Sequence, residues 1–98
     1  MMFVADSQES TRLTVWVHGY VQGVGFRWWA RSKALELGLA GSASNLPDGR
    51  VEIVAEGPRG NCEQLLTVLS SGTSPGRVDR VVKRWSPARG DLDGFVER

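Results

Sequence analysis

The strictest constraint on the fold is a short segment, 13–18, in which apolar and polar residues alternate. Leu13, Val15 and Val17 fall on one side of an extended chain, and the residues between them fall on the other. A period of two is typical of a strand with one face against a core. We therefore expect a first strand here, with its outward face made by Thr14, Trp16 and His18.

A β-hairpin is expected over 40–56. Its second strand, 50–56, alternates cleanly. Its first strand, 40–46, is weak by composition, but the turn signal Pro47-Asp48-Gly49 that follows supports it. The apolar face of the second strand carries Val51, Ile53 and Ala55.

Two segments carry the helical spacing of three and four residues. The first runs from about Phe26 to Leu37, and Gly38 follows it as a natural helix-ending residue because glycine accepts positive φ. The second is expected to begin at Asn61, whose side chain can cap the first turn, with Gln64 reaching back to it. The apolar stripes are Phe26, Ala30, Ala34 and Leu37 in the first segment, and Cys62, Leu65, Leu66 and Leu69 in the second.

A strand over 78–85 and a short last strand beginning at Phe95-Val96 complete the pattern. Val81-Val82 interrupts the alternation, so the sequence does not decide which side of 78–85 faces the core. The order β-α-β-β-α-β is that of the ferredoxin-like, or split βαβ, arrangement. We therefore predict an α+β sandwich, in which an antiparallel sheet of four to five strands carries two helices on one face.

The length of 98 residues suits one domain. We expect a flexible tail over 1–10 and the domain over 11–98. Twelve basic against eleven acidic side chains give a net charge of +1, which offers no general attraction to nucleic acid or to a membrane surface. No apolar run reaches the roughly 20 residues of a membrane helix. A chain this small is expected to be a monomer that binds any anion at a local site.

Cys62 is the single cysteine. It cannot form an internal disulfide, which favours a reducing compartment, and the first residues lack the charged and apolar regions of a secretory signal. We therefore expect a cytoplasmic protein. Nothing in the sequence pairs Cys62 with the only histidine, His18, so Cys62 is expected to be structural rather than a nucleophile.

The segment with the most chemical information is 18–27, which joins the first strand to the first helix. Gly19, Gly23 and Gly25 allow sharp turns that leave backbone N–H groups pointing inward, and the first helical turn adds N–H groups without internal partners. Together these form a cradle for a phosphate-sized anion. Arg27 would lie in that first turn, where its guanidinium can bind two phosphate oxygens.

Glycine loops before helices have several uses, including a tight turn made only for packing. A nucleotide-binding P-loop would end in Gly-Lys-Ser or Gly-Lys-Thr, whereas Gly25 is followed by Phe26-Arg27. The dinucleotide fingerprint needs Gly-x-Gly-x-x-Gly, and the glycines here are spaced by four and then two. The aromatic sheet signature of RNA-recognition domains is missing. The spacing of the glycines alone does not decide between a turn made for packing and an anion-binding site.

The complete string Val21-Gln22-Gly23-Val24-Gly25-Phe26-Arg27 resembles the signature of the acylphosphatase family. A second stretch resembles that family's second motif, with Gly38-Leu39, Gly41, Asn45-Leu46-Pro47-Asp48-Gly49 and Val51-Glu52. The resemblance covers roughly residues 12–98, including the order of the expected elements. It implies a hydrolase that cleaves the carboxyl–phosphate bond of small acyl phosphates, without a metal or a cofactor.

The resemblance also implies roles by position. Arg27 matches the arginine that binds the substrate phosphate, and Asn45 matches the asparagine that positions the attacking water. Inorganic phosphate or a similar anion is expected to bind the loop whose backbone amides come from Gln22, Gly23, Val24, Gly25 and Phe26. Trp28-Trp29 is bulkier than is usual in the family.

Several other side chains have simpler explanations than chemistry. His18 points away from the core and is expected to serve loop packing rather than act as a general base. Asp48 belongs to the turn, and Glu52 and Glu56 to the outer face of a strand, so no metal site is expected. Two larger groups are expected to be structural: Trp16, Trp28, Trp29 and Trp85 through packing, and Arg77, Arg80, Lys83 and Arg84 as a solvated strand edge.

Three other functions stay compatible with this fold. A non-catalytic phosphate-binding module would need the glycine cradle and Arg27 but not Asn45. Similar domains begin larger carbamoyl-transfer proteins that mature hydrogenases, whose zinc-binding cysteine motifs this sequence lacks. A ferredoxin-like RNA- or protein-interaction domain is disfavoured by the balanced charge.

Overall fold

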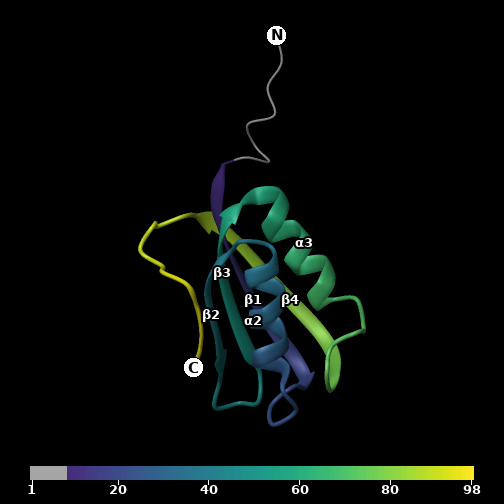
Figure 1. Cartoon of the computed structure of the whole chain (residues 1–98). Coiled ribbons are helices and arrows are strands. Elements are labelled where there is room, and N and C mark those ends of the chain that lie inside the picture. Colours follow the sequence, from purple (N-terminus) through teal and green to yellow (C-terminus); the bar gives the residue numbers. More distant parts are fainter. Residues whose placement is uncertain (1–8) are drawn as a thin grey trace.

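The computed structural model describes residues 9–98 and gives each periodic segment the expected type of secondary structure (Figure 1). The predicted tail, 1–10, lies outside the described residues except at its end, where Ser10 already pairs with Pro58. Within 9–98, no helix has the length and apolar character needed to cross a bilayer. The elements are β1 (Ser10–Tyr20), α2 (Phe26–Glu36), β2 (Ala40–Asn45), β3 (Val51–Pro58), α3 (Arg59–Leu69), β4 (Arg77–Pro87) and β5 (Phe95–Glu97).

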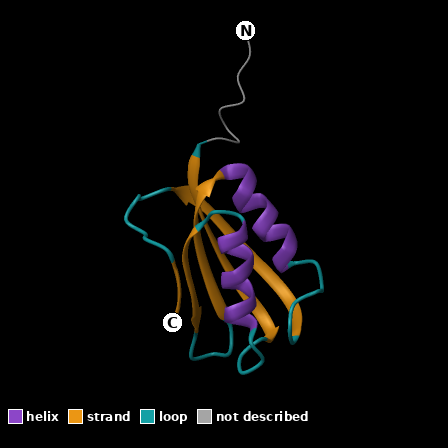
Figure 2. Ribbon diagram, in the orientation of Figure 1, coloured by secondary structure: helices purple, strands orange, loops and turns teal. Residues whose placement is uncertain are grey.

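The strands form one sheet in the order β4-β1-β3-β2-β5, and both helices cover the same face of it (Figure 2). The predicted α+β arrangement is confirmed. One pairing differs from the expected antiparallel pattern, because β5 runs parallel to β2 and pairs Val96 with Ser42. The parallel pairing follows from the path of the chain between β4 and β5. β4 ends beside the start of β1, so the loop 88–94 crosses that end of the sheet and β5 begins where β2 begins.

The core lies between the two helices and the apolar face of the sheet. The predicted stripes of both helices face this core, with Leu37 and Leu66 partly buried at its margin. Full burial of one such aliphatic or aromatic side chain stabilises the fold by roughly 1.5–3 kcal/mol. The apolar strand residues without exposed surface are Leu13, Val15, Val17, Ala43, Val51, Ile53 and Ala55, and the buried helix residues are Phe26, Ala30, Ala34, Cys62, Leu65 and Leu69.

The start of α3 differs from the prediction. The helix begins at Arg59, directly after β3, and the residue before it is Pro58. Asn61 therefore lies inside the first turn, and its side-chain amide donates to the carbonyl oxygen of Leu37 at 2.9 Å. That carbonyl lies just after the end of α2, where the last C=O groups lack helical partners. Asn61 thus joins the two helices instead of capping its own.

β4 is an edge strand, and its core-facing side is now defined. Val78, Val81 and Trp85 pack against the core. The odd spacing between the first two arises from a register shift, since His18 pairs with Arg80 but the next residue, Gly19, pairs with Val78. One extra residue in a strand reverses the alternation beyond it. The predicted solvated edge is confirmed, because its basic side chains are exposed: Arg77, Arg80, Lys83 and Arg84.

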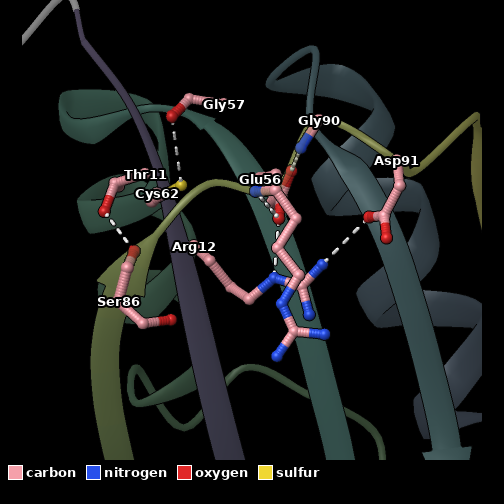
Figure 3. A network of polar contacts seen from close by, with 9 residues as sticks. Thr11, Arg12, Glu56, Gly57, Cys62, Ser86, Gly90 and Asp91 are labelled. Carbon is pink, nitrogen blue, oxygen red and sulfur yellow. Dashed lines mark hydrogen bonds and ion pairs between the residues drawn. The ribbon is translucent and has the colours of Figure 1, made fainter.

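Glu56 lies on the outer face of β3, as expected, yet only 8% of its surface is exposed. Its carboxylate accepts hydrogen bonds from the Arg12 guanidinium at 2.6 Å and from the main-chain N–H groups of Arg89 and Gly90 at 2.9 and 3.1 Å (Figure 3). The loop 88–94 contributes two of these donors. The carboxylate therefore fixes the connection that leads from β4 to β5.

The surroundings of Glu56 also set its protonation. Burial raises the pKa of this carboxyl, but the N–H of Arg89, the Arg12 guanidinium and the N–H of Gly90 together outweigh burial and hold the pKa below its ordinary value of 4.5. A carboxyl with a lower pKa in the folded state stabilises the fold above its unfolded pKa. That stabilisation is lost as the pH falls from about 4.5 through the folded value.

We predict that Glu56→Gln lowers the free energy of unfolding by about 2 kcal/mol at neutral pH, because a neutral amide cannot accept from all three donors. The matched control is Glu52→Gln on the same strand face, which keeps an acceptor for the Trp16 indole N–H and should cost about 0.5 kcal/mol or less. Urea unfolding at pH 7 and pH 3.5 measures both. The deficit of Glu56→Gln should shrink at the lower pH, and an equal deficit at both would contradict the assignment.

Candidate active site

The site is built where two loops meet at one end of the sheet. The first loop, 21–25, joins β1 to α2, and the second is the turn between β2 and β3. Gln22 connects them, because its side-chain amide donates to the carbonyl oxygens of Leu46 at 2.8 Å and Arg50 at 2.9 Å. The turn itself is closed by Asp48, whose carboxylate accepts from the N–H and the guanidinium of Arg50. One side chain therefore fixes the distance between the glycine loop and the hairpin.

Two glycines give the first loop its shape. Gly23 has φ of 76° and Gly25 has φ of 85°, in the left-handed region that other residues adopt only with strain. Gly25 directly precedes α2, and its carbonyl oxygen accepts the N–H of Trp29 at 3.0 Å. The N–H groups of the first helical turn have no partners within the helix and carry its positive dipole end. This arrangement is suited to an anion.

A cavity of about 90 Å³ lies against this loop. Among the residues predicted for the site, Gly23, Gly25, Phe26 and Arg27 line it. The remaining lining residues, which the sequence analysis did not assign to the site, are Val21, Trp28 and Glu97.

Arg27 lies in the first turn of α2, as predicted from its sequence position. Its guanidinium donates a hydrogen bond to the main-chain oxygen of Arg98, just after β5. Within residues 9–98, no Asp or Glu side chain forms an ion pair with Arg27, although Glu97 lines the same cavity. The guanidinium thus has one donor engaged in holding its position.

Asn45 ends β2 and is exposed. Its main-chain N–H donates at 3.2 Å to the same oxygen of Arg98 that receives the Arg27 guanidinium. Arg98 in turn donates its N–H to the carbonyl oxygen of Ala43 at 2.7 Å. No hydrogen bond within the described part of the chain engages the side-chain amide of Asn45. The two residues predicted for catalysis therefore meet at one main-chain atom.

Three predicted site residues have other contacts. The side chain of Gln22 serves the hairpin, and Val24 packs against the core. Asn45 does not line the cavity itself, although its main-chain N–H and the Arg27 guanidinium share the oxygen of Arg98. Nothing in the sequence indicated that Arg98 would join Arg27 and Asn45, apart from the short strand predicted before it. Arg98 does so through a main-chain oxygen, and every residue type has one.

The remaining reactive side chains lie away from the cavity. His18 pairs with Arg80 across β1 and β4. Burial raises the pKa of the Cys62 thiol to about 11, so Cys62 is a neutral, buried side chain at physiological pH. Residues 9–98 contain no group of three His, Cys, Asp or Glu side chains placed to hold a metal ion.

Comparison with known proteins gives a consistent result. The model of the acylphosphatase family matches residues 13–96. An acylphosphatase of Nocardia farcinica is 67% identical over 90 residues, which cover 92% of this chain and 90% of the relative. One of Saccharopolyspora erythraea is 65% identical over 95 residues, or 97% and 99% of the two chains. The crystal structure of the Bacillus subtilis acylphosphatase superimposes with a TM-score of 0.84 at 34% identity, over 90% of this chain and 98% of that one.

The glycine loop can be tested with two substitutions on the same helix. Gly25 precedes α2 and Gly38 follows it, both have positive φ, and neither would place a Cβ near another atom. Alanine at either position should cost roughly 1–2 kcal/mol of stability through backbone strain. We predict that only Gly25→Ala weakens binding of inorganic phosphate, by about tenfold or more, because it re-aims the N–H groups of the loop.

Calorimetric titration with phosphate, beside urea unfolding, separates the two effects. Equal phosphate affinity in Gly25→Ala and Gly38→Ala would show that the loop does not hold the anion.

Proposed function

The chain belongs to the acylphosphatase family, and we propose that it hydrolyses acyl phosphates to a carboxylate and inorganic phosphate with Arg27 and Asn45 as its catalytic residues. The observation that carries this assignment is the shared oxygen of Arg98, which brings the guanidinium of Arg27 and the main chain of Asn45 together beside the cavity. That contact uses the main chain of Asn45. Its side-chain amide makes no hydrogen bond within residues 9–98 and is free to hold a water molecule, which a module that only bound phosphate would not need.

The chemistry makes modest demands on the protein. An acyl phosphate is a mixed anhydride, and its leaving group is a carboxylate whose conjugate acid has a pKa of roughly 4. Such a group departs without being protonated, so no general acid is required. Phosphoryl transfer needs mainly correct positioning and stabilisation of charge on the phosphoryl oxygens.

Arg27 and the loop amides are proposed to supply that charge stabilisation. The phosphoryl group would occupy the cavity beside Gly23, Gly25 and Phe26, where N–H groups of the loop and of the first helical turn can donate to its oxygens. The guanidinium is held on one side by Arg98 and can direct its remaining N–H groups to the phosphate. This support needs no metal ion, since the positive charge comes from Arg27 and the helix end.

Asn45 is proposed to place the nucleophile. Its side-chain amide has no partner within residues 9–98 and can hydrogen-bond a water molecule at the mouth of the cavity. A water held there approaches phosphorus opposite the leaving carboxylate oxygen, and the fixed geometry replaces a chance encounter. The water oxygen bonds to phosphorus, the P–O bond to the acyl group breaks, and a proton passes to solvent. No phosphoenzyme forms on this path.

Two further properties belong to the same proposal. Cys62 is the single cysteine and is buried as a thiol, which suits a reducing compartment such as the cytoplasm. The site is assembled from segments of one chain, so a monomer can form it completely.

The experiment that tests the proposal is hydrolysis of benzoyl phosphate with a chelator present. We predict turnover in the wild type, a loss of about a hundredfold or more in kcat for Asn45→Ala with phosphate affinity nearly intact, and losses of both in Arg27→Ala. The matched control is Asn61→Ala, which removes the other asparagine of the chain and should lower stability but not kcat.

A folded wild type without turnover would leave the phosphate-binding module as the function. Loss of turnover on chelation would contradict metal independence, and equal phosphate affinity in wild type and Arg27→Ala would contradict the part given to Arg27.

A further inference from the structure

The cavity opens to solvent, and this has a consequence for specificity that rests on the proposed function. A phosphoryl group held by Gly23, Gly25 and Arg27 would direct its acyl group toward that opening. The side chains at the rim of the cavity decide which acyl groups bind well.

Trp28 lies at this rim. It follows Arg27 in the first turn of α2, lines the cavity and has 62% of its surface exposed. Two of the other tryptophans expected to pack, Trp29 and Trp85, behave differently. Trp29 lies with its ring centroid 5.6 Å from that of Phe26, and Trp85 packs against the core under the guanidinium of Arg59. Packing accounts for those two but not for Trp28, so the structural interpretation of Trp28 is wrong.

An exposed indole beside a small polar cavity is suited to a ligand with an apolar part. A single exposed apolar side chain is ordinary on a protein surface, and what distinguishes Trp28 is that it lines the same cavity as Arg27. Trp28 offers a flat face on which a ring can stack, whereas the cavity beside it takes the charged end of the same molecule. The helix places both features next to each other, since Arg27 and Trp28 are consecutive.

Glu97 borders the same rim from β5. Side chains alternate along a strand, so Glu97 projects to the same face as the buried Phe95, which is the face that α2 covers. Glu97 is exposed and lines the cavity, and no ion pair within residues 9–98 involves it. A second negative charge on the acyl group would be repelled there.

We propose that Trp28 and Glu97 form the acyl subsite and select uncharged, aromatic acyl groups. Trp28 is the residue that distinguishes a large apolar acyl group from a small one, through contact with its ring. Glu97 discriminates against acyl groups that carry their own carboxylate or phosphate. Neither residue takes part in bond breaking, which belongs to Arg27 and Asn45.

The test compares kcat/KM for three substrates that share one reacting bond. Acetyl phosphate lacks a ring, benzoyl phosphate has one, and 4-carboxybenzoyl phosphate adds a negative charge to that ring. We expect Trp28→Ala to lower the ratio of benzoyl to acetyl phosphate by about tenfold, since ring contacts of this kind contribute on that scale. We expect Glu97→Gln to raise the ratio of 4-carboxybenzoyl to benzoyl phosphate by about threefold, an effect that added salt diminishes.

The control is Tyr20→Ala, which removes another aromatic side chain with 62% of its surface exposed, at the end of β1 and outside the cavity lining. An unchanged benzoyl-to-acetyl ratio in Trp28→Ala, or an equal fall in Tyr20→Ala, would overturn the subsite. An unchanged 4-carboxybenzoyl-to-benzoyl ratio in Glu97→Gln would overturn the charge discrimination. Acetyl phosphate turnover in every variant keeps these failures distinct from failure of the proposed function, which is shown by a wild type that hydrolyses none of the three.

Discussion

Two hydrogen bonds to one main-chain oxygen hold the two halves of the site together. The oxygen of Arg98 accepts from the guanidinium of Arg27 on α2 and from the N–H of Asn45 at the end of β2. An arginine side chain at a helix end would otherwise sample many rotamers, at a cost in entropy whenever it had to bind phosphate. Because the acceptor fixes one end of the guanidinium, its remaining donors are arranged before a ligand arrives.

The position of that oxygen depends on a connection at the opposite end of the sheet. The loop 88–94 is fixed by the buried carboxylate of Glu56, and β5 then runs beside β2 toward the site. Arg31 adds a second tie between α2 and β5, since its guanidinium donates to the carbonyl oxygen of Phe95 at 2.9 Å. The buried ion pair of Arg12 and Glu56 thus helps to position the oxygen that joins Arg27 and Asn45, although it lies at the opposite end of the sheet.

The hydrogen bonds of Gln22 explain how the hairpin keeps its position relative to the glycine loop. Gln22 donates two hydrogen bonds across to the turn, so the end of β2 cannot shift relative to the start of α2 without losing both. Its two acceptors are main-chain carbonyls, which no substitution in the turn can remove. In the motif around Gln22, the glycines line the cavity and the Gln22 side chain holds the hairpin in place.

The secondary structure and the overall α+β arrangement could be predicted from the sequence, whereas individual contacts between residues distant in sequence could not. The strand at 13–18 and the stripe of α2 follow from periodicity, which is a property of neighbouring residues. The positions of Arg27 and Asn45 came from the resemblance to a family, and their roles stay predictions. What escaped prediction depends on partners distant in sequence: the helix-joining bond of Asn61, the burial of Glu56 and the exposure of Trp28.

The most direct test of the central claim is where oxygen from water ends up. In water enriched in ¹⁸O, one enzymatic turnover of benzoyl phosphate followed by mass spectrometry distinguishes attack at phosphorus from attack at the carbonyl carbon. If Asn45 and Arg27 direct water to phosphorus, the inorganic phosphate carries one ¹⁸O atom and the benzoate carries none. Label in the benzoate would contradict the account, because the cavity would then be holding the leaving group rather than the group under attack.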